Sequence, residues 1–500
     1  MKEKNLQKKT VSFFSFILMV VFLIIPSNSQ QISETDEELL VSPLLANKYD
    51  LEYKLDLNKG LVYSEGYVSV KNIGNKSAKV LPIILYKDLK VEQVTSQQGK
   101  SLDYTQKIVT FPDDPSYTVN YVQINLNKRM DPKTERSFFI KYSGTIDESL
   151  NKDGYVRDSI NPEFSYIRTE TNAYPMICYP NYKNRRQTFE HFWTGHPFDY
   201  RIKIIVPKGY VAANIGRLIE KNESGEGVRY IYENILGAWR IDIMIAKYAY
   251  LNDPKTQIKM FFFPEDSEIA EKAFQFQLKA YRIYTQWFEP LNDTPIGFTI
   301  IQTPSWDGGQ SDITGVIQSG RISVRSFPGY AHEIAHFWGP NTPEKYRWIN
   351  EGQASYLQYR LLKEIGDEKG LEEGMLIRKK VFTEYITKYP EARELTLNDY
   401  VEKGKGNHDH VMNYHKGAWV YYLLDKIVGD DTFNRIISSL CNDFEGRLVT
   451  NEDFINHAEK GKWQKFINVL AGLDLQQQIN GISLRRPSYR RNGQEIYLIP

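Results

Sequence analysis

Two histidines separated by three residues constrain the fold of this chain more than any other feature. His332 and His336 lie in a mostly apolar segment, and on a helix their spacing places both imidazoles on one face. Two imidazoles arranged in this way can bind one tetrahedral Zn²⁺ ion. Glu333 then lies beside the ion, where a carboxylate can act as general base toward a metal-bound water. Gly339 and Pro340 are predicted to end this helix.

A second helix, with a carboxylate in its first turn, is predicted at 348–365. Apolar residues recur there at helical spacing until Gly366. Glu351 opens this helix, and one carboxylate with two imidazoles makes up the three protein ligands of a catalytic zinc. The fourth position of such an ion stays open for water or substrate. The sequence therefore predicts a Zn²⁺ site on His332, His336 and Glu351.

These motifs resemble the M1 family of zinc metallopeptidases, gluzincins that include aminopeptidase N and leukotriene A4 hydrolase. His-Glu-x-x-His is followed at 348–352 by Trp-x-Asn-Glu-Gly, in the family's order. Only fourteen residues separate His336 from Glu351, a shorter connection than the family usually has. Connections that run over a protein surface tolerate such changes of length. The resemblance implies a thermolysin-like catalytic domain, one Zn²⁺ per chain and peptidase activity.

A tyrosine motif extends the resemblance. Residues 414–418 match the family's Tyr-x-Lys-Gly-Ala, whose tyrosine donates a hydrogen bond to the developing oxyanion. A phenol suits this role because it stays protonated at neutral pH. The resemblance thus implies two catalytic residues, Glu333 as general base and Tyr414 as oxyanion donor.

The residues expected to bind the amino terminus of a substrate depart from the family's motif. Gly309 belongs to a glycine-flanked polar run, which suggests an edge strand or loop whose backbone approaches a ligand closely. By position this run corresponds to the family's Gly-x-Met-Glu-Asn, and Asp312 stands where that amine-binding glutamate would be. Glu170, eight residues before Cys178, is a second candidate if a gap is allowed. An ordinary loop acid is the alternative for Asp312 and for Glu170.

Periodicity divides the chain into a β-rich part and a helical part. From 46 to 252, short runs such as 49–55 alternate apolar and charged residues between clusters of Gly, Pro, Asn and Asp. This pattern predicts antiparallel sheet with one solvated face. From 253 to 470, a strand at 258–263 is followed by mostly helical patterns. The expected fold class is α+β, an N-terminal antiparallel β-domain followed by a mostly helical catalytic domain, which the family resemblance makes thermolysin-like.

The two ends of the chain carry different signals. Residues 1–29 are typical of an export signal, with four lysines, the apolar run 11–25 and small residues before the expected cleavage site. The apolar run is shorter than the ~20 residues that cross a bilayer, which favours a cleaved signal over a membrane anchor. An acidic linker is expected at 30–45 and a basic tail at 471–500. The mature protein is expected to be exported, periplasmic or extracellular.

Charge and cysteine content narrow the possible partners. A net charge of +1 in 500 residues implies neither nucleic acid nor an anionic surface as a partner. Cys178 and Cys441 could pair after export or remain buried thiols. The hypothesis is a zinc-dependent aminopeptidase that acts on peptides and has no stable insertion in a membrane. The altered amine-binding motif leaves an endopeptidase or restricted peptidase open, and a non-catalytic secreted binding module on the same fold is a third possibility.

Overall fold

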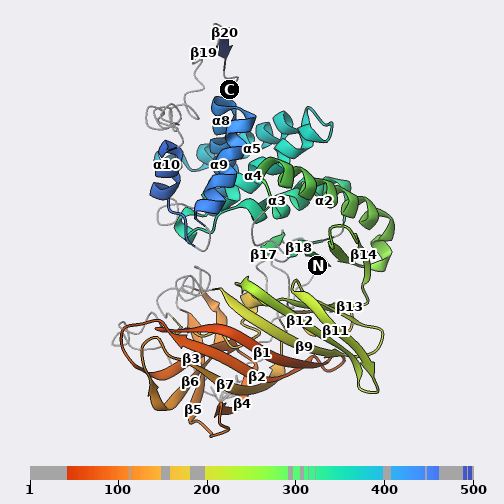
Figure 1. The fold of residues 1–500 in the computed structure, drawn as a ribbon, viewed down its shortest axis with the longest axis vertical. Coiled ribbons are helices and arrows are strands. Elements are labelled where there is room, and N and C mark those ends of the chain that lie inside the picture. Colours follow the sequence, from red (N-terminus) through yellow and green to blue (C-terminus); the bar gives the residue numbers. More distant parts are fainter. Residues whose placement is uncertain are drawn as a thin grey trace, which may run out of the picture.

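A β-rich half and a mostly helical half make up the chain in a computed structural model (Figure 1). The described residues are 42–111, 114–147, 158–180, 197–290, 297–304, 309–312, 315–320, 322–397, 407–444, 447–460, 488–491 and 494–497. The export signal expected at 1–29, most of the linker expected at 30–45 and most of the tail expected at 471–500 lie outside them. In the second half, the strands β17 (Gln310–Asp312) and β18 (Gly315–Ser319) lie on the side toward the β-rich half.

Three sheets build the β-rich half. The largest has seven strands in the order β11-β12-β9-β1-β2-β7-β4, and two three-stranded sheets have the orders β3-β6-β5 and β10-β13-β8. All pairings in these sheets are antiparallel except that of β1 with β9. The strands are β1 (Leu44–Asp56), β2 (Leu61–Asn72), β3 (Ala78–Tyr86), β4 (Leu89–Ser96), β5 (Tyr104–Phe111), β6 (Asp114–Met130), β7 (Glu135–Thr145), β8 (Ser165–Ile167), β9 (Phe198–Val206), β10 (Val211–Ala213), β11 (Arg217–Ser224), β12 (Gly227–Ala238) and β13 (Ile243–Ala246).

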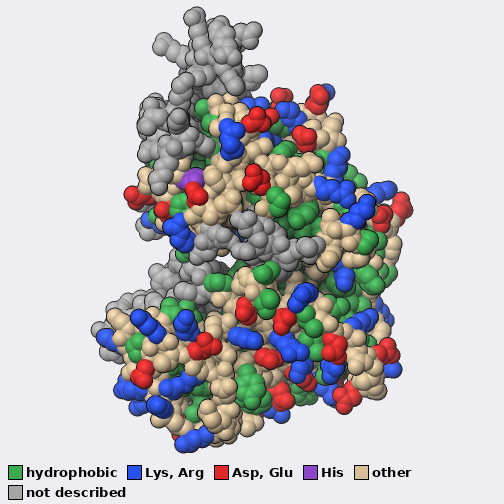
Figure 2. Space-filling model, in the orientation of Figure 1, with side chains coloured by type: hydrophobic (Ala, Val, Ile, Leu, Met, Phe, Trp, Pro, Cys, Tyr) green, Lys and Arg blue, Asp and Glu red, His purple; other side chains and the backbone are tan. Residues whose placement is uncertain are grey.

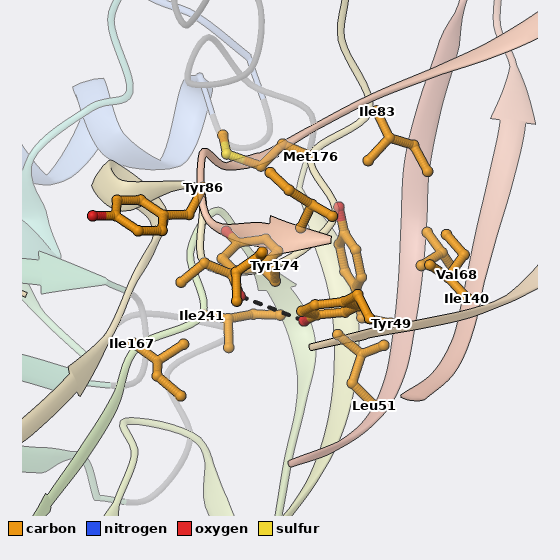
Figure 3. Packing of buried hydrophobic residues seen from close by; sticks show 14 of the residues in the cluster. Tyr49, Leu51, Val68, Ile83, Tyr86, Ile140, Ile167, Tyr174, Met176 and Ile241 are labelled. Carbon is orange, nitrogen blue, oxygen red and sulfur yellow. Dashed lines mark hydrogen bonds between the residues drawn. The ribbon is translucent and has the colours of Figure 1, made fainter. Parts of the chain in front are cut away.

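Alternation along the strands decides which face is buried. In β1, Tyr49, Leu51, Tyr53 and Leu55 are buried while the intervening charged residues are not, as the sequence predicts. The buried faces pack around aromatic rings: Tyr49 meets Tyr174 edge to face, with centroids 5.4 Å apart (Figure 3). The Tyr49 hydroxyl donates a 2.8 Å hydrogen bond to the carbonyl of Pro175, which satisfies a buried polar group.

The opposite faces of these strands carry mixed charge. Lysine, arginine, aspartate and glutamate side chains are interspersed over the visible surface of the β-rich half, and basic and acidic residues do not separate into large patches there (Figure 2). This distribution agrees with a whole-chain charge near zero.

A five-stranded sheet opens the second half. Its order is β14-β15-β16-β18-β17, and β15, β16 and β18 run parallel while β14 and β17 are antiparallel edges. The long helix α2 (Ser267–Phe288) connects β15 to β16, because parallel neighbours need a crossover. The strands are β14 (Ala249–Asn252), β15 (Lys259–Phe262), β16 (Thr299–Thr303), β17 (Gln310–Asp312) and β18 (Gly315–Ser319).

Helices make up most of the remaining described chain. Most of their buried residues share one apolar cluster with α2 and the five-stranded sheet, and the end of α5 packs in a second, smaller cluster with Val411 and Met412. The helices are α3 (Phe327–Ala335), α4 (Trp348–Glu364), α5 (Gly370–Lys388), α7 (His408–His410), α8 (Gly417–Val428), α9 (Asp430–Asp443) and α10 (Asn451–Lys460), with 3₁₀ turns η2 (Thr169–Thr171), η3 (Pro264–Asp266), η4 (Val324–Ser326), η5 (His336–Trp338), η6 (Glu344–Tyr346) and η7 (Pro390–Glu394) and a π-helix η8 (Val411–Lys416).

A small apolar cluster joins the two halves. It combines Tyr166 and Met244 of the β-rich half with Phe261, Ile301 and Ile317 of the second sheet. Because side chains from both halves are buried in it, the cluster fixes where the five-stranded sheet lies against the β-rich half.

Two of the expected boundaries fall inside elements of the structure. Strand β1 begins at Leu44, inside the range expected to be linker, and the boundary expected at 253 falls between β14 and β15, two paired strands of one sheet. The second half therefore begins at β14. The expected basic tail contains a short hairpin, β19 (Ser488–Arg491) with β20 (Gln494–Tyr497). No helix in the described residues is both long enough and apolar enough to span a bilayer.

Candidate metal centre and active site

Helix α3 presents the two histidines. Pro328 lies in its first turn, where a missing N–H is not needed, and the helix passes at His336 into the turn η5. Gly339 is extended, with φ −94° and ψ 135°, and so ends the helical segment as predicted. The side chains of His332 and Glu333 are buried, and Glu351 is buried in the first turn of α4. In Figure 1, α3 and α4 lie on the side of the helical half that faces the β-rich half.

Three ligand atoms converge between α3 and α4. His332 Nε2 lies 3.1 Å from His336 Nε2 and 3.2 Å from Glu351 Oε2, and His336 Nε2 lies 3.5 Å from the same oxygen. Tetrahedral ligands at ~2.0–2.1 Å from zinc are separated from one another by roughly 3.3 Å. The donor set and its spacing therefore fit Zn²⁺. Within the described part of the chain, this is the sole cluster of three or more such side chains that could hold a metal ion.

The protonation states of two of the three ligands suit a metal directly. Burial lowers the pKa of His332 to about 4, so this imidazole is neutral near pH 7. Burial opposes ionisation of Glu351, but Arg347 and His336 outweigh it and hold the Glu351 pKa well below its usual range. A neutral imidazole and an ionised carboxylate are the forms that bind a metal ion. For the third, His336, burial lowers the pKa but the Glu351 carboxylate outweighs burial and raises it, so this imidazole loses its proton when a metal binds.

Glu333 has the environment of a base that works near neutral pH. Burial, the first cause, and repulsion from Glu351 raise its pKa to about 7, against the opposing effect of His336. The backbone of Gly309 packs against it: a Cβ at position 309 would lie 2.3 Å from Glu333 Cγ. The backbone of Gly309 therefore lies against the carboxylate of Glu333, whereas the sequence predicted its close approach to a ligand.

Tyr414 lies over the cluster of three expected metal ligands. Its ring stacks on His332, with centroids 5.7 Å apart and planes 16° apart, and it belongs to the π-helix η8. π-Helical turns are rare and frequent at functional sites. Burial first, and the Glu351 carboxylate second, raise the pKa of Tyr414 well above its usual value, so the phenol keeps its proton at neutral pH. The structure thus brings Tyr414 together with the three metal ligands.

Arg347 completes this cluster and was not predicted from the sequence. Its Nε and Nη2 donate hydrogen bonds of 3.0 and 2.9 Å to Glu351 Oε1, and Nη2 donates a further 3.0 Å bond to the Tyr414 hydroxyl. The available signal was its place four residues before Glu351, which puts both residues on one helix face.

Glu170 reaches the same region from the β-rich half. Its Oε1 accepts a 3.0 Å hydrogen bond from Gln310 Nε2, one residue from Gly309, and its Oε2 accepts a 3.0 Å bond from Arg240 Nη2. Burial opposes ionisation of Glu170, but Arg240 and then Arg168 outweigh it and lower its pKa. Glu170 is therefore an ionised carboxylate with part of its side chain exposed, held beside β17.

Asp312 lies at the other end of β17 and is buried. Residues two apart on a strand point to the same side, so Asp312 shares a face with Gln310. Its charge acts on Tyr200 of the β-rich half, whose pKa is raised first by burial and then by Asp312. Gly309 and Gln310 thus border Glu333 and Glu170, and the Asp312 carboxylate faces the β-rich half.

The two cysteines do not pair in this structure. Cys178 is buried in the β-rich half, whereas Cys441 Sγ donates a hydrogen bond to the carbonyl of Trp338 in the helical half. Burial raises the pKa of both thiols, that of Cys441 to about 12.

Comparison with known proteins identifies the family. Residues 328–477 match the family described as the peptidase family M1 domain. This part of the chain belongs to the M1 peptidase family. The M1 match covers both metal helices and Tyr414, and zinc is the cofactor of this family, which agrees with the donor set described above.

Relatives of known sequence share one part of this chain. Over 130 residues, a quarter of its length, it is 29% identical to leucine aminopeptidase 2 of Emericella nidulans and 31% identical to the protein of the same name in Ajellomyces capsulatus. A leukotriene A-4 hydrolase homolog of Botryotinia fuckeliana is 27% identical over 130 residues. The matched segment spans about a fifth of the length of each relative.

Solved structures extend the similarity of the fold. An M1 zinc metallopeptidase from Deinococcus radiodurans superposes with a TM-score of 0.61 at 14% identity, over 87% of this chain and 93% of that one. Yeast LTA4 hydrolase superposes with a TM-score of 0.65 at 17% identity, over 88% of this chain and 68% of that one. The α+β fold predicted for this chain, a β-rich half followed by a mostly helical half, is thereby confirmed.

Proposed function

We propose that the protein is a zinc-dependent aminopeptidase that removes residues from the amino terminus of peptides. The observation that carries the proposal is the convergence of His332, His336 and Glu351 on one point beside the buried carboxylate of Glu333. The family assignment supports peptidase chemistry, and the relatives named leucine aminopeptidase support cleavage at the amino terminus.

His332, His336 and Glu351 would hold the metal. A zinc ion bound there supplies Lewis acidity, which makes water a better nucleophile and the scissile carbonyl a better electrophile at neutral pH. Glu333 accepts the proton of the attacking water, because its carboxylate lies beside the three ligands and its burial strengthens it as a base. It then delivers that proton to the nitrogen of the leaving amine.

Tyr414 would stabilise the charge that develops on the carbonyl oxygen. Its phenol is protonated at neutral pH and is fixed by stacking on His332 and by the hydrogen bond from Arg347. A donor fixed in advance stabilises an oxyanion without reorganising during the reaction.

Glu170 is the stronger candidate for the α-ammonium group of the substrate. It is an ionised carboxylate, partly exposed, and its partner Gln310 adjoins the glycine that packs on Glu333. Asp312, which faces the β-rich half, would add negative charge behind this position. An ammonium bound at Glu170 would place the first peptide bond of a substrate near the metal.

A comparison of free and blocked substrates tests the proposal. The zinc-loaded protein should cleave an aminoacyl fluorogenic amide and a free tripeptide, but not the N-acetylated forms, because acetylation removes the ammonium charge. Equal cleavage of both forms would favour an endopeptidase. No cleavage of any peptide by protein with one bound zinc would favour a non-catalytic binding module.

We also propose that the protein is exported, because residues 1–29 have the lysine-rich start and apolar run of an export signal. N-terminal sequencing of the protein purified from its natural source tests this proposal. A new terminus near residue 30 is expected, and an intact Met1 would contradict cleavage.

A further inference from the structure

Arg347 contacts two proposed site residues at once. It is the N-cap residue of α4. Its backbone carbonyl accepts a 3.0 Å hydrogen bond from the Glu351 N–H, which places the two residues one helical turn apart. Its guanidinium then folds over Glu351 and reaches Tyr414 on η8. One side chain thus links the third metal ligand to the proposed oxyanion donor.

The two oxygens of Glu351 have different partners. Oε1 accepts both hydrogen bonds from Arg347, while Oε2 lies 3.2 and 3.5 Å from the imidazole nitrogens of His332 and His336. A rigid planar guanidinium fixes a carboxylate more strictly than a flexible ammonium does. Arg347 therefore holds Glu351 in the orientation that directs one oxygen, Oε2, to the metal position.

The bond to Tyr414 has a defined direction. A guanidinium has no acceptor, so the phenol oxygen must accept the hydrogen bond from Arg347 and the phenol proton must point elsewhere. That proton is left for an acceptor on the metal side, where Glu351 lies in this structure and where a substrate carbonyl oxygen would arrive.

This ion pair differs from an ordinary surface pair at the same spacing. Lys272 and Glu268 form such a pair, with the Glu268 side chain 93% exposed. The Glu351 side chain is only 10% exposed, although that of Arg347 is 42% exposed. Exposed pairs contribute little, whereas removing one partner leaves a buried carboxylate with fewer hydrogen bonds.

We propose that Arg347 is a positioning residue for the peptidase reaction, holding Glu351 against the metal and directing the Tyr414 proton toward the scissile carbonyl. This inference rests on the proposed function for its second part alone. Its first part, the positioning of Glu351, can be tested by measuring zinc affinity, which needs no turnover.

Metal affinity gives the first test, on the full-length protein with a competing chelator. Arg347→Ala should weaken zinc binding by roughly 10- to 100-fold, the usual effect of losing a partner of a metal ligand. Lys345→Ala is the matched control, since it removes a neighbouring exposed cation that contacts only the ring of Tyr346 among the contacts seen here. Zinc affinity of Arg347→Ala within twofold of the wild type would overturn the hold on Glu351.

The second test measures, at saturating zinc, whether the effect of Arg347 on kcat depends on Tyr414. Arg347→Ala should lower kcat by roughly 10- to 100-fold with little change in KM, because misdirected catalytic groups act on the transition state. In a Tyr414→Phe background the same substitution should lower kcat by less than about threefold, since its target is already gone. Equal losses in both backgrounds would overturn the role of Arg347 in directing the phenol.

Arg347→Lys keeps the charge and guards against loss of the fold. This variant should retain the wild-type circular dichroism spectrum and part of the zinc affinity. Its kcat should still fall to nearly that of Arg347→Ala, because lysine lacks the planar fork. Full kcat in this variant would also overturn the proposal. If the wild-type protein cleaves no peptide, the proposed function fails, while the zinc-affinity measurement still decides whether Arg347 holds Glu351.

Discussion

Gln310 donates a 3.0 Å hydrogen bond to Glu170 and so joins the two halves of the molecule beside the proposed zinc site. Gln310 lies on β17, an edge strand of the five-stranded sheet, and Glu170 lies in the 3₁₀ turn η2 of the β-rich half. The proposed amine-binding carboxylate is therefore positioned by one half and the proposed base by the other.

Removing the charge of Glu170 tests its proposed role. Glu170→Gln should lower kcat/KM for free peptides by roughly 10- to 100-fold, mainly through KM, because a hydrogen bond to a charged group contributes about 1.5–3 kcal/mol. Steady-state kinetics on an aminoacyl amide measure this. Glu163→Gln, an exposed carboxylate of the same half, is the control and should leave KM unchanged.

Gly309 should accept no side chain. Gly309→Ala would place a Cβ 2.3 Å from Glu333 Cγ, so either β17 or the base must move. We expect turnover to fall by at least about 100-fold, because a shift of ~1 Å at a catalytic group can have this effect. Gly329→Ala on α3 is the matched control: its Cβ meets nothing within 4 Å, and activity should stay near that of the wild type.

Tyr414→Phe should separate catalysis from binding. The ring can still stack on His332, so fold and zinc content should be preserved. Loss of an oxyanion donor lowers kcat by roughly 100- to 1,000-fold, and we expect little change in KM. Parallel losses in kcat and in substrate affinity would instead indicate a packing role for the tyrosine.

Glu333→Gln should abolish turnover and leave zinc bound. The amide keeps the shape of the carboxylate but cannot accept a proton from water. Metal analysis of the purified variant should still find one zinc per chain, because Glu333 is not one of the three converging ligands. Retained hydrolysis would rule out Glu333 as the base.

The same substitution should change how the stability of metal-free protein depends on pH. Glu333 has a folded pKa of about 7, above its usual 4.5, so the folded state binds more protons than the unfolded state between these values. Stability contributed by this group is present below pH 4.5 and is lost as pH rises through 7.

Chelator-treated wild type should accordingly lose on the order of 3 kcal/mol of unfolding free energy relative to Glu333→Gln between pH 5 and 8. Urea unfolding of both proteins at the two pH values measures the difference. A constant difference would contradict the raised pKa of this carboxylate.

Much of the fold could be read from local periodicity. The alternation at 49–55 and the helical spacing after Trp348 each report a buried face, and burial is what the structure shows at Tyr49, Leu51 and Leu357. Short strands such as β8 and β10 were not predicted, because three residues carry too little periodicity and their pairing depends on distant partners.

In the candidate site, too, some residues could be predicted from local sequence and others depend on tertiary packing. His332, Glu333 and His336 lie within five consecutive residues, and a helix alone brings the two imidazoles together, so the sequence was sufficient to predict them. Convergence of Glu351 and Tyr414 on these histidines required the packing of α4 and η8 against α3, for which the family motifs were the available guide.

The sequence by itself determined the helices, the pair of histidines with its glutamate, and the division into a β-rich and a helical half, because each depends on residues close together in the chain. Only the tertiary structure decided that Arg347 links Glu351 to Tyr414, that Gly309 packs on Glu333, and that Gln310 connects Glu170 to the catalytic half. These contacts join segments that are far apart in sequence or depend on which way a side chain turns, and local patterns carry no information on either.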